Sequence, residues 1–142
     1  MLDKVKIRRL QVKKPPLDVD GGRILTAAGE IAQIVSGVSF KFLAYIEFNA
    51  DRFAPRGNHF HRNKIETFYV IKGRLEAVYE DVETKQRFTT TLETGDLVTV
   101  LSGCAHVYYA HEYTQLVEFA TGAFDASDTY PYHLSLEHPV NS

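Results

Sequence analysis

The stretch that decides the fold is Gly57-Asn58-His59-Phe60-His61, followed after four residues by Glu66 and after six more by Gly73. Successive side chains of a β-strand point to opposite faces, so His59 and His61 share one face. If the four-residue connection is tight, the next strand brings Glu66 back opposite these two imidazoles. Gly73 then permits a further turn. The stretch therefore predicts two imidazoles and one carboxylate gathered on one side of a hairpin.

A second stretch supplies a third imidazole. It begins at Gly95-Asp96, continues as an expected strand over residues 97–101, turns at Ser102-Gly103 and reaches His106. A barrel that closes the two hairpins against each other would place His106 beside the first three groups. Three imidazoles and one carboxylate form a mixed nitrogen and oxygen site for a divalent transition metal such as Fe, Mn, Ni or Zn. Four protein ligands on an octahedral ion would leave two positions for water or a substrate oxygen.

Residues 57–73 resemble the first sequence motif of the cupin superfamily, and residues 95–106 resemble the second. One departure is Leu101, which stands where the second motif usually has proline, and it removes no ligand. The resemblance implies an all-β, single-domain cupin, which is a jelly-roll barrel or double-stranded β-helix. It also implies a metal on His59, His61, Glu66 and His106, although some cupins keep such histidines and work without metal. A weaker likeness, from Arg56 through the tail at residues 124–130, connects the chain with small cupins of nucleotide-sugar and polysaccharide pathways.

The rest of the chain agrees with a β-barrel. Its 8 Tyr and 9 Phe favour strands, and short segments of strand character alternate with turn signals, as in sandwiches and barrels. The expected strands cover residues 40–48, 67–71, 74–80, 87–92, 97–101, 105–110 and 115–120. Residues 27–35 are a candidate for a short helix, which Gly29 weakens. We expect one domain over residues 1–142, with an N-terminal arm or strand (1–20), the barrel (21–123) and an irregular tail (124–142).

Further side chains are candidates for catalysis or substrate binding. Tyr108 shares a face with the third imidazole, so it either donates a proton at the barrel mouth or fills the barrel taper. Glu66 is a second catalytic candidate beside its role as ligand. Tyr45 and Glu47 share one face of an earlier strand, which either lines the cavity or points to solvent. Arg56 could bind a carboxylate or phosphate through its fork of donors, although a loop arginine is more often simply exposed.

The remaining histidines and the cysteine show no chemical pattern. His111, His133 and His138 have no partner at a recognisable spacing, and we expect them at the surface or in packing. Cys104, the single cysteine, lies in the turn before His106, where it could approach the metal, and we expect it to be a small buried hydrophobe.

Three functions remain open at this point. The first is an enzyme that uses the metal as a Lewis acid on a small oxygenated or sugar-derived substrate, as an isomerase, epimerase or lyase. The second is a non-haem Fe(II) dioxygenase, in which the open positions hold O₂ and substrate. The third is a non-catalytic module that binds a sugar or a metal. A free-standing chain favours an enzyme.

Composition excludes several other classes. The formal net charge is -2, and the basic residues between Lys4 and Lys14 alternate with apolar ones, so a nucleic-acid partner is not expected. No segment approaches the roughly 20 apolar residues of a membrane span, and no apolar secretion signal begins the chain. We therefore expect a cytoplasmic protein with a small-molecule substrate. The strand that ends near Val12 could pair with a neighbouring copy, which favours a homodimer.

Overall fold

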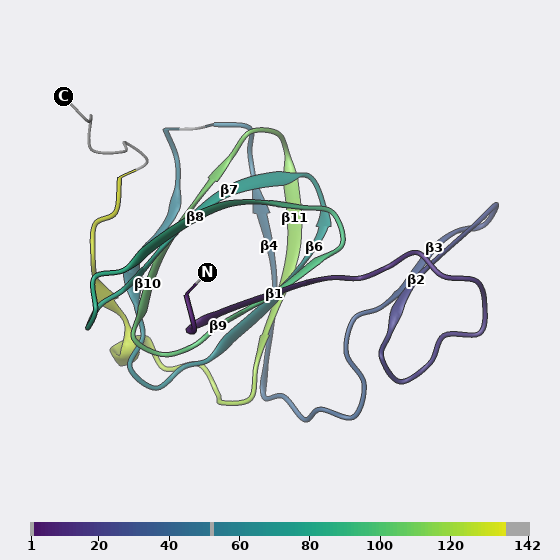
Figure 1. Cartoon of the computed structure of the whole chain (residues 1–142), viewed down its shortest axis with the longest axis horizontal. Coiled ribbons are helices and arrows are strands. Elements are labelled where there is room, and N and C mark those ends of the chain that lie inside the picture. The colour runs from purple at the N-terminus through teal and green to yellow at the C-terminus, as the bar shows by residue number, and fades with distance from the viewer. Residues whose placement is uncertain (1, 52, 136–142) are drawn as a thin grey trace.

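The computed structural model describes residues 2–51 and 53–135, in which two five-stranded antiparallel sheets close into a barrel (Figure 1). One sheet has the strand order β1-β9-β6-β11-β4, and the other has the order β12-β5-β10-β7-β8. A third, two-stranded sheet consists of β2 and β3. The all-β jelly-roll fold predicted from the sequence is confirmed. No helix among the described residues is long and apolar enough to span a membrane.

The elements follow one another along the chain with short connections. In order they are β1 (Val5–Arg9), β2 (Gly22–Thr26), β3 (Gly29–Gln33), β4 (Phe42–Phe48), β5 (Arg56–Phe60), β6 (Glu66–Lys72), β7 (Arg74–Asp81), β8 (Arg87–Glu93), β9 (Asp96–Val100), β10 (Cys104–Ala110), β11 (Thr114–Ala120), the 3₁₀ helix η1 (Ala126–Asp128) and β12 (Tyr130–Pro131). The seven strands expected from the sequence correspond to β4 and to β6 through β11, with ends that differ by at most two residues.

The short helix suggested for residues 27–35 was a wrong prediction. These residues form the turn and the second strand of the β2–β3 hairpin, in which Gly22 pairs with Gln33 and Thr26 pairs with Gly29. Gly29 has a φ of 123°, which an α-helix does not accommodate. The Thr26 hydroxyl closes the turn by accepting from the Ala28 amide and donating to the Gly29 carbonyl.

The limits expected for the arm, the barrel and the tail also differ from those observed. β1 belongs to the barrel, because Val5 through Arg9 pair with β9. The β2–β3 hairpin, expected inside the barrel, projects away from it (Figure 1). The tail is regular in part, since it contains η1 and since β12 pairs with β5. Residues 136–142, which include His138, lie outside the described part of the chain.

The core lies between the two large sheets and also fixes one wall of the site. Its largest fully buried side chains include Tyr79, Leu75 and Leu92. Phe68 and Tyr108 belong both to this core and to the wall of the cavity described below. Core packing therefore holds these two rings in place on the side that the cavity does not occupy.

Two glycines permit close approaches that the barrel needs. Gly57 has a φ of 115°, and a Cβ at this position would lie 2.5 Å from the carbonyl oxygen of His106. Gly73 has a φ of 113°, and a Cβ there would collide with Thr114. Only glycine fits both the backbone conformation and the space at these positions. Gly57 thereby allows β5 to lie against β10, which brings their histidines together.

Candidate metal and substrate site

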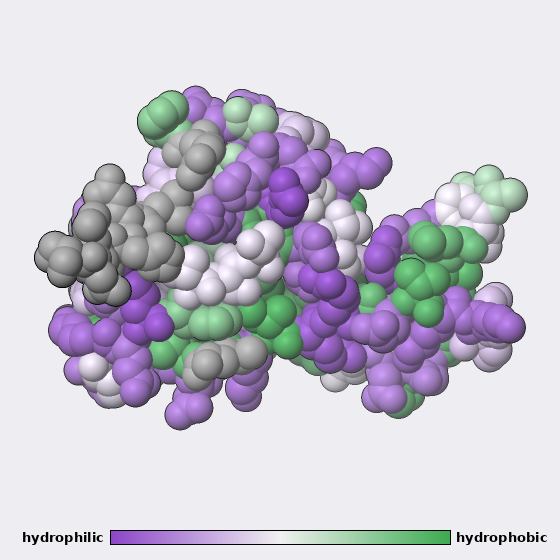
Figure 2. Space-filling model, turned by 45° about the horizontal axis from the view of Figure 1, so that its top comes forward, coloured by the Kyte–Doolittle hydropathy of each residue, from purple (hydrophilic) through white to green (hydrophobic). Residues whose placement is uncertain are grey.

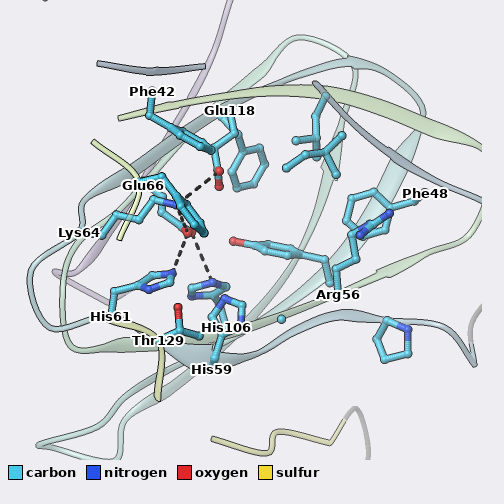
Figure 3. Close-up of a pocket in the computed structure, with 17 residues that line it drawn as sticks. Phe42, Phe48, Arg56, His59, His61, Lys64, Glu66, His106, Glu118 and Thr129 are labelled. Atoms are coloured by element: carbon cyan, nitrogen blue, oxygen red, sulfur yellow. Dashed lines mark hydrogen bonds and ion pairs between the residues drawn. The ribbon is translucent and has the colours of Figure 1, made fainter. Parts of the chain in front are cut away.

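The four predicted metal ligands come together in the barrel. His59 lies on β5, His61 follows that strand directly, Glu66 begins β6 and His106 lies on β10. β5 and β10 are neighbours, and His59 is paired with His106 in register. One potential ligand atom from each of the four side chains lies within 4.8 Å of the others, and the side chains converge in the close-up view (Figure 3).

Glu66 is the centre of this cluster. Its Oε1 lies 2.8 Å from His61 Nε2, and its Oε2 lies 3.3 Å from His106 Nε2. The other ring nitrogens of these histidines donate to backbone carbonyls: His61 Nδ1 to Asp128 at 2.7 Å and His106 Nδ1 to Cys104 at 3.1 Å. Such outer hydrogen bonds fix the orientation of a ring and leave its inner nitrogen directed at the cluster.

The cluster shifts the pKa of each of its members. Burial, together with the nearby His106 and His61, lowers the pKa of His59 to about 4. Burial also lowers the pKa of His106. For His61 burial acts in the same direction, but the hydrogen bond and charge of Glu66 outweigh it and raise the pKa. Burial opposes ionisation of Glu66, yet the imidazoles hold the pKa of this carboxyl below its usual range.

The donor set fits a divalent transition metal. Imidazole and carboxylate together suit Fe, Mn, Ni and Zn, and none of the four groups is an exposed side chain. Two ligands on opposite sides of one ion, each at 2.0–2.2 Å, are about 4.4 Å apart. The observed spread of 4.8 Å is a few tenths of an ångström larger. Small rotations of these side chains would bring all four within bonding distance of one point.

The cluster forms one wall of a cavity of about 420 Å³. Much of the remaining wall is apolar and comes from β4, β6 and β11, with further contributions from the tail. The apolar lining residues are Phe42, Ile46, Phe48, Pro55, Phe68, Leu116 and Phe124. This size and the mixture of apolar walls with a few convergent polar groups are typical of small-molecule sites.

Tyr108 lines this cavity. Its hydroxyl accepts a hydrogen bond of 3.2 Å from the Tyr79 hydroxyl, so its own proton is free to be donated. Burial and the neighbouring Tyr79 raise the pKa of Tyr108 well above the usual value. Tyr108 is therefore a neutral hydroxyl donor in the cavity wall at physiological pH, and it also packs edge-on against Phe68 with ring centroids 5.3 Å apart.

Lys64 and Glu118 are cavity residues that the sequence reasoning missed. Lys64 Nζ lies between two carboxylates, 3.2 Å from Glu66 Oε1 and 3.5 Å from Glu118 Oε2 (Figure 3). Burial and the charge of Glu66 raise the pKa of Glu118. Alternation along β11 places Glu118 on the same face as Leu116 but does not reveal which face looks inward. Lys64 lies in the four-residue gap of the motif, whose conformation no simple pattern predicts.

Two of the predicted substrate-binding residues do not reach the cavity. Tyr45 and Glu47 lie on β4, but the alternate residues of that strand face inward, so these two point to the outer surface. Tyr45 is 56% exposed, and its hydroxyl donates to Glu47 Oε2 at 2.9 Å. Arg56 does line the cavity. Its guanidinium lies over the Phe48 ring, 5.4 Å from the centroid, and donates to the Glu47 carbonyl at 3.0 Å.

The other predicted positions lie away from this chemistry. Cys104 is buried, and burial raises the pKa of its thiol to about 12, which agrees with an inert packing residue. His111 pairs with Glu76 at 3.0 Å outside the cavity, and His133 is exposed.

Comparison with known families and structures agrees with this geometry. The family model described as "Cupin" matches residues 42–133, which hold all four clustered ligands. This chain belongs to the cupin family. No curated protein matches its sequence significantly.

Several solved structures share the cupin barrel of this chain. A mutant of the 3,4-ketoisomerase QdtA from Thermoanaerobacterium thermosaccharolyticum, in complex with TDP-4-keto-6-deoxyglucose, has a TM-score of 0.72 and 15% identity and covers 91% of this chain and 88% of its own. The WlaRB TDP-quinovose 3,4-ketoisomerase from Campylobacter jejuni has a TM-score of 0.69, 16% identity and coverage of 92% and 94%. The dTDP-4-dehydrorhamnose 3,5-epimerase from Sulfolobus tokodaii has a TM-score of 0.70, 16% identity and coverage of 84% and 78%. At these identities the likeness establishes the fold.

Proposed function

We propose that this cupin is an enzyme that removes a proton from a carbon beside the carbonyl group of a small, sugar-derived substrate and returns a proton either to the neighbouring carbon, as an isomerase, or to the opposite face of the same carbon, as an epimerase. The observation that carries the proposal is the cluster of three imidazoles and Glu66 in the wall of a largely apolar cavity. The same cavity holds Lys64, Glu118 and Tyr108, which can exchange protons with a bound molecule. The sugar ketoisomerases and the epimerase of the same fold support this reaction class.

We also propose that His59, His61, Glu66 and His106 hold one divalent transition metal, namely Fe, Mn, Ni or Zn. When bound, the metal would supply a Lewis acid for a substrate oxygen. The hydrogen bonds from the outer ring nitrogens to the carbonyls of Asp128 and Cys104 preset the two rings that make them. These hydrogen bonds fix the orientation of two of the imidazole rings, and such fixed orientation supports a metal role for the cluster.

The proton transfer is assigned to side chains outside the cluster. Glu118 is a cavity carboxylate with a raised pKa, so its protonated and ionised forms are closer in free energy than those of an exposed carboxyl. Lys64 lies beside it and holds the carboxylate in place. Tyr108 keeps its proton and can donate a hydrogen bond to an oxygen that gains charge as the carbon-bound proton leaves.

Side chains at the cavity mouth are suited to bind a part of the substrate that is anionic and aromatic. Arg56 presents a planar cation, which suits phosphate. The rings of Phe42 and Phe124 stack with centroids 6.1 Å apart, and Phe124 is 68% exposed. A nucleotide-activated sugar would place its sugar in the cavity, its phosphates near Arg56 and its base near these rings.

The test uses purified full-length protein loaded separately with Fe(II), Mn(II), Ni(II) or Zn(II) in D₂O. The substrates are TDP-4-keto-6-deoxyglucose and the same keto sugar without nucleotide. Proton NMR should show deuterium at a carbon beside the keto group and the growth of an isomer. His106→Ala should abolish both signals. An absence of exchange with every metal and both substrates would contradict the proposed function.

The same assay distinguishes the alternatives. Oxygen uptake coupled to substrate loss would indicate the non-haem Fe(II) dioxygenase, whereas unchanged exchange under argon excludes it. Chelator treatment should leave less than about one tenth of an equivalent of metal in the protein. Full exchange in this metal-depleted protein would assign the proton transfer to the side chains alone. Tight binding of either substrate without exchange would indicate a binding module.

A further inference from the structure

Asp128 joins the C-terminal segment to the candidate metal site through four residues of the first motif. It lies at the end of η1 and is buried, with 5% of its surface exposed. Its carboxylate accepts hydrogen bonds from the backbone amides of Arg62 at 2.8 Å, Asn63 at 3.1 Å and Lys64 at 2.9 Å. Its backbone carbonyl accepts from His61 Nδ1 at 2.7 Å.

These contacts act on the connection between two candidate ligands. Residues 62–64 lie between His61 and Glu66, and three successive amides of this connection point to one carboxylate. Hydrogen bonds from amides to an ionised carboxylate are stronger than those between neutral groups. Loss of the charge would leave partly buried amides with a poorer partner, and the connection would relax.

We infer that Asp128 is a positioning residue for the metal site, which fixes the connection with its carboxylate and the His61 ring with its carbonyl. The inference rests on the proposed function, which assigns His61 and Glu66 as metal ligands. Asp128 does not line the cavity, so it acts through His61 and the connection and not on the substrate.

The tail has further attachments that would hold it in place without this carboxylate. The Tyr130 ring stacks on Phe60 with centroids 5.3 Å apart. Leu134 is buried, and its amide donates to Asn58 Oδ1 at 2.8 Å. A change at Asp128 that keeps the side-chain shape is therefore expected to leave the tail docked and to alter the connection only.

The chain offers a matched control in the same short helix. Asp125 caps η1 by accepting from the Ser127 amide at 3.0 Å, is exposed, and has no hydrogen bond or ion pair with residues 61–66, all of which the structure describes. Asn serves as a helix cap as well as Asp does. Asp125→Asn and Asp128→Asn thus make the same chemical change, but only the second places an NH₂ group against backbone amides of the connection.

The experiment measures metal affinity and the metal's surroundings in the full chain. Zn(II) affinity is measured by competition with a chelator, and Co(II) is used for its visible absorption spectrum. Asp128→Asn should weaken Zn(II) binding about 10- to 100-fold and change the Co(II) spectrum, with an unchanged far-UV circular dichroism spectrum. Asp125→Asn should match the wild type in all three measurements. Affinity of Asp128→Asn within about twofold of the wild type would overturn the inference.

A metal-free measurement separates this inference from the proposed function. In chelator-treated protein labelled with ¹⁵N-histidine, NMR should show a hydrogen-bonded Nδ1–H for His61 in the wild type and in Asp125→Asn. This signal should shift or vanish in Asp128→Asn, and an identical signal would overturn the inference. If the wild type binds no metal, the proposed metal role fails, and the NMR result alone decides the role of Asp128.

Discussion

Glu66 is the residue at which the charged groups of the cavity meet. Its oxygens contact His61 and His106, and Lys64 Nζ lies 3.2 Å from Oε1. A buried carboxylate is costly unless such partners compensate its lost hydration. The loss of any partner therefore changes the electrostatics of the whole cluster, and this coupling underlies the predictions for single residues.

The metal ligands should differ from other histidines of the chain. His59→Ala and His106→Ala should each lower the metal content of the purified protein at least about tenfold, since each removes one of four ligands. The β fold should persist by circular dichroism. Elemental analysis measures the content, and His111→Ala, which changes a histidine paired with Glu76 away from the site, is the control. Metal content unchanged in both site variants would remove the assignment.

Glu118 should be needed for proton transfer and dispensable for metal binding. Glu118→Gln keeps the shape of the side chain but removes its capacity as a base, so kcat should fall by about 10²- to 10⁴-fold. Elemental analysis should show wild-type metal content. Glu112→Gln is the control, because Glu112 is a surface carboxylate that pairs with Arg74 at 3.8 Å. If Glu118→Gln keeps the wild-type kcat, the base for proton transfer must be another group.

Individual residues show why sequence reasoning found part of the site. The four ligands were predicted because strand alternation and fixed gaps determine where their side chains point. Tyr45 and Glu47 were left between cavity lining and solvent because alternation defines two faces without identifying the inner one. Asp128 was missed because it acts from the tail, 67 residues from His61, through backbone groups that carry no sequence signal.

At the scale of elements, β4 and β6 through β11 were predicted well, and the projecting β2–β3 hairpin was not. β6 lies between β9 and β11, and its continuous apolar run over residues 68–70 is buried. In contrast, β2 and β3 pair only with each other in the described structure, apart from a bridge between Val12 and Arg23. Their residues are mostly half-buried or exposed, so they lack the pattern that distinguishes a strand from a helix.

The contact between β5 and β10 should depend on Gly57. Gly57→Ala would place a Cβ 2.5 Å from the His106 carbonyl oxygen and strain a backbone with a φ of 115°. The free energy of unfolding in urea should fall by at least about 2 kcal/mol, and metal affinity should fall with it. Gly122→Ala, where a Cβ meets nothing within 4 Å, should be nearly neutral. Equal stability of the two variants would contradict the close packing described for this strand pair.

The ion pair between Lys4 and Asp81 ties the start of β1 to the end of β7, with Nζ and Oδ1 2.9 Å apart. The hydrogen bond from Lys4 lowers the pKa of Asp81 below its ordinary 3.8. Because the folded pKa is the lower one, this stabilisation is complete above pH 3.8 and disappears as the pH falls through the folded pKa.

Asp81→Asn should therefore destabilise the protein at neutral pH and much less in acid. The loss should be about 1 kcal/mol at pH 7, measured by urea unfolding, and should shrink as the pH falls below the ordinary 3.8 and through the lower folded pKa. Asp3→Asn changes an exposed carboxyl of the same segment and should have little effect at either pH. A loss that does not depend on pH would show that the ion pair is not its source.

At the scale of the whole molecule, the β2–β3 hairpin is the least supported part of the fold. It stands away from the barrel (Figure 1), and Figure 2 shows apolar surface gathered on this projecting part. Leu25 is 56% exposed and Ile31 is 63% exposed. A two-stranded hairpin is only marginally stable by itself in water, so a second copy of the chain that covers this surface would account for its persistence.

We expect a homodimer in which this hairpin contributes to the interface. Light scattering should give twice the mass of one chain for the wild type and a monomer for Ile31→Asp. Phe53→Asp, which changes a side chain that is 96% exposed outside the hairpin, should remain dimeric. A monomeric wild type would contradict this arrangement.

The central claim is that three imidazoles and Glu66 hold one divalent ion, and an anomalous diffraction map tests it most directly. Crystals of the full chain grown with Zn(II) or Mn(II) should show one strong anomalous peak within about 2.0–2.3 Å of a nitrogen of His59, His61 and His106 and of an oxygen of Glu66. An ion bound elsewhere, or crystals in which Lys64 occupies the centre of the cluster and no peak appears with either metal, would contradict the account.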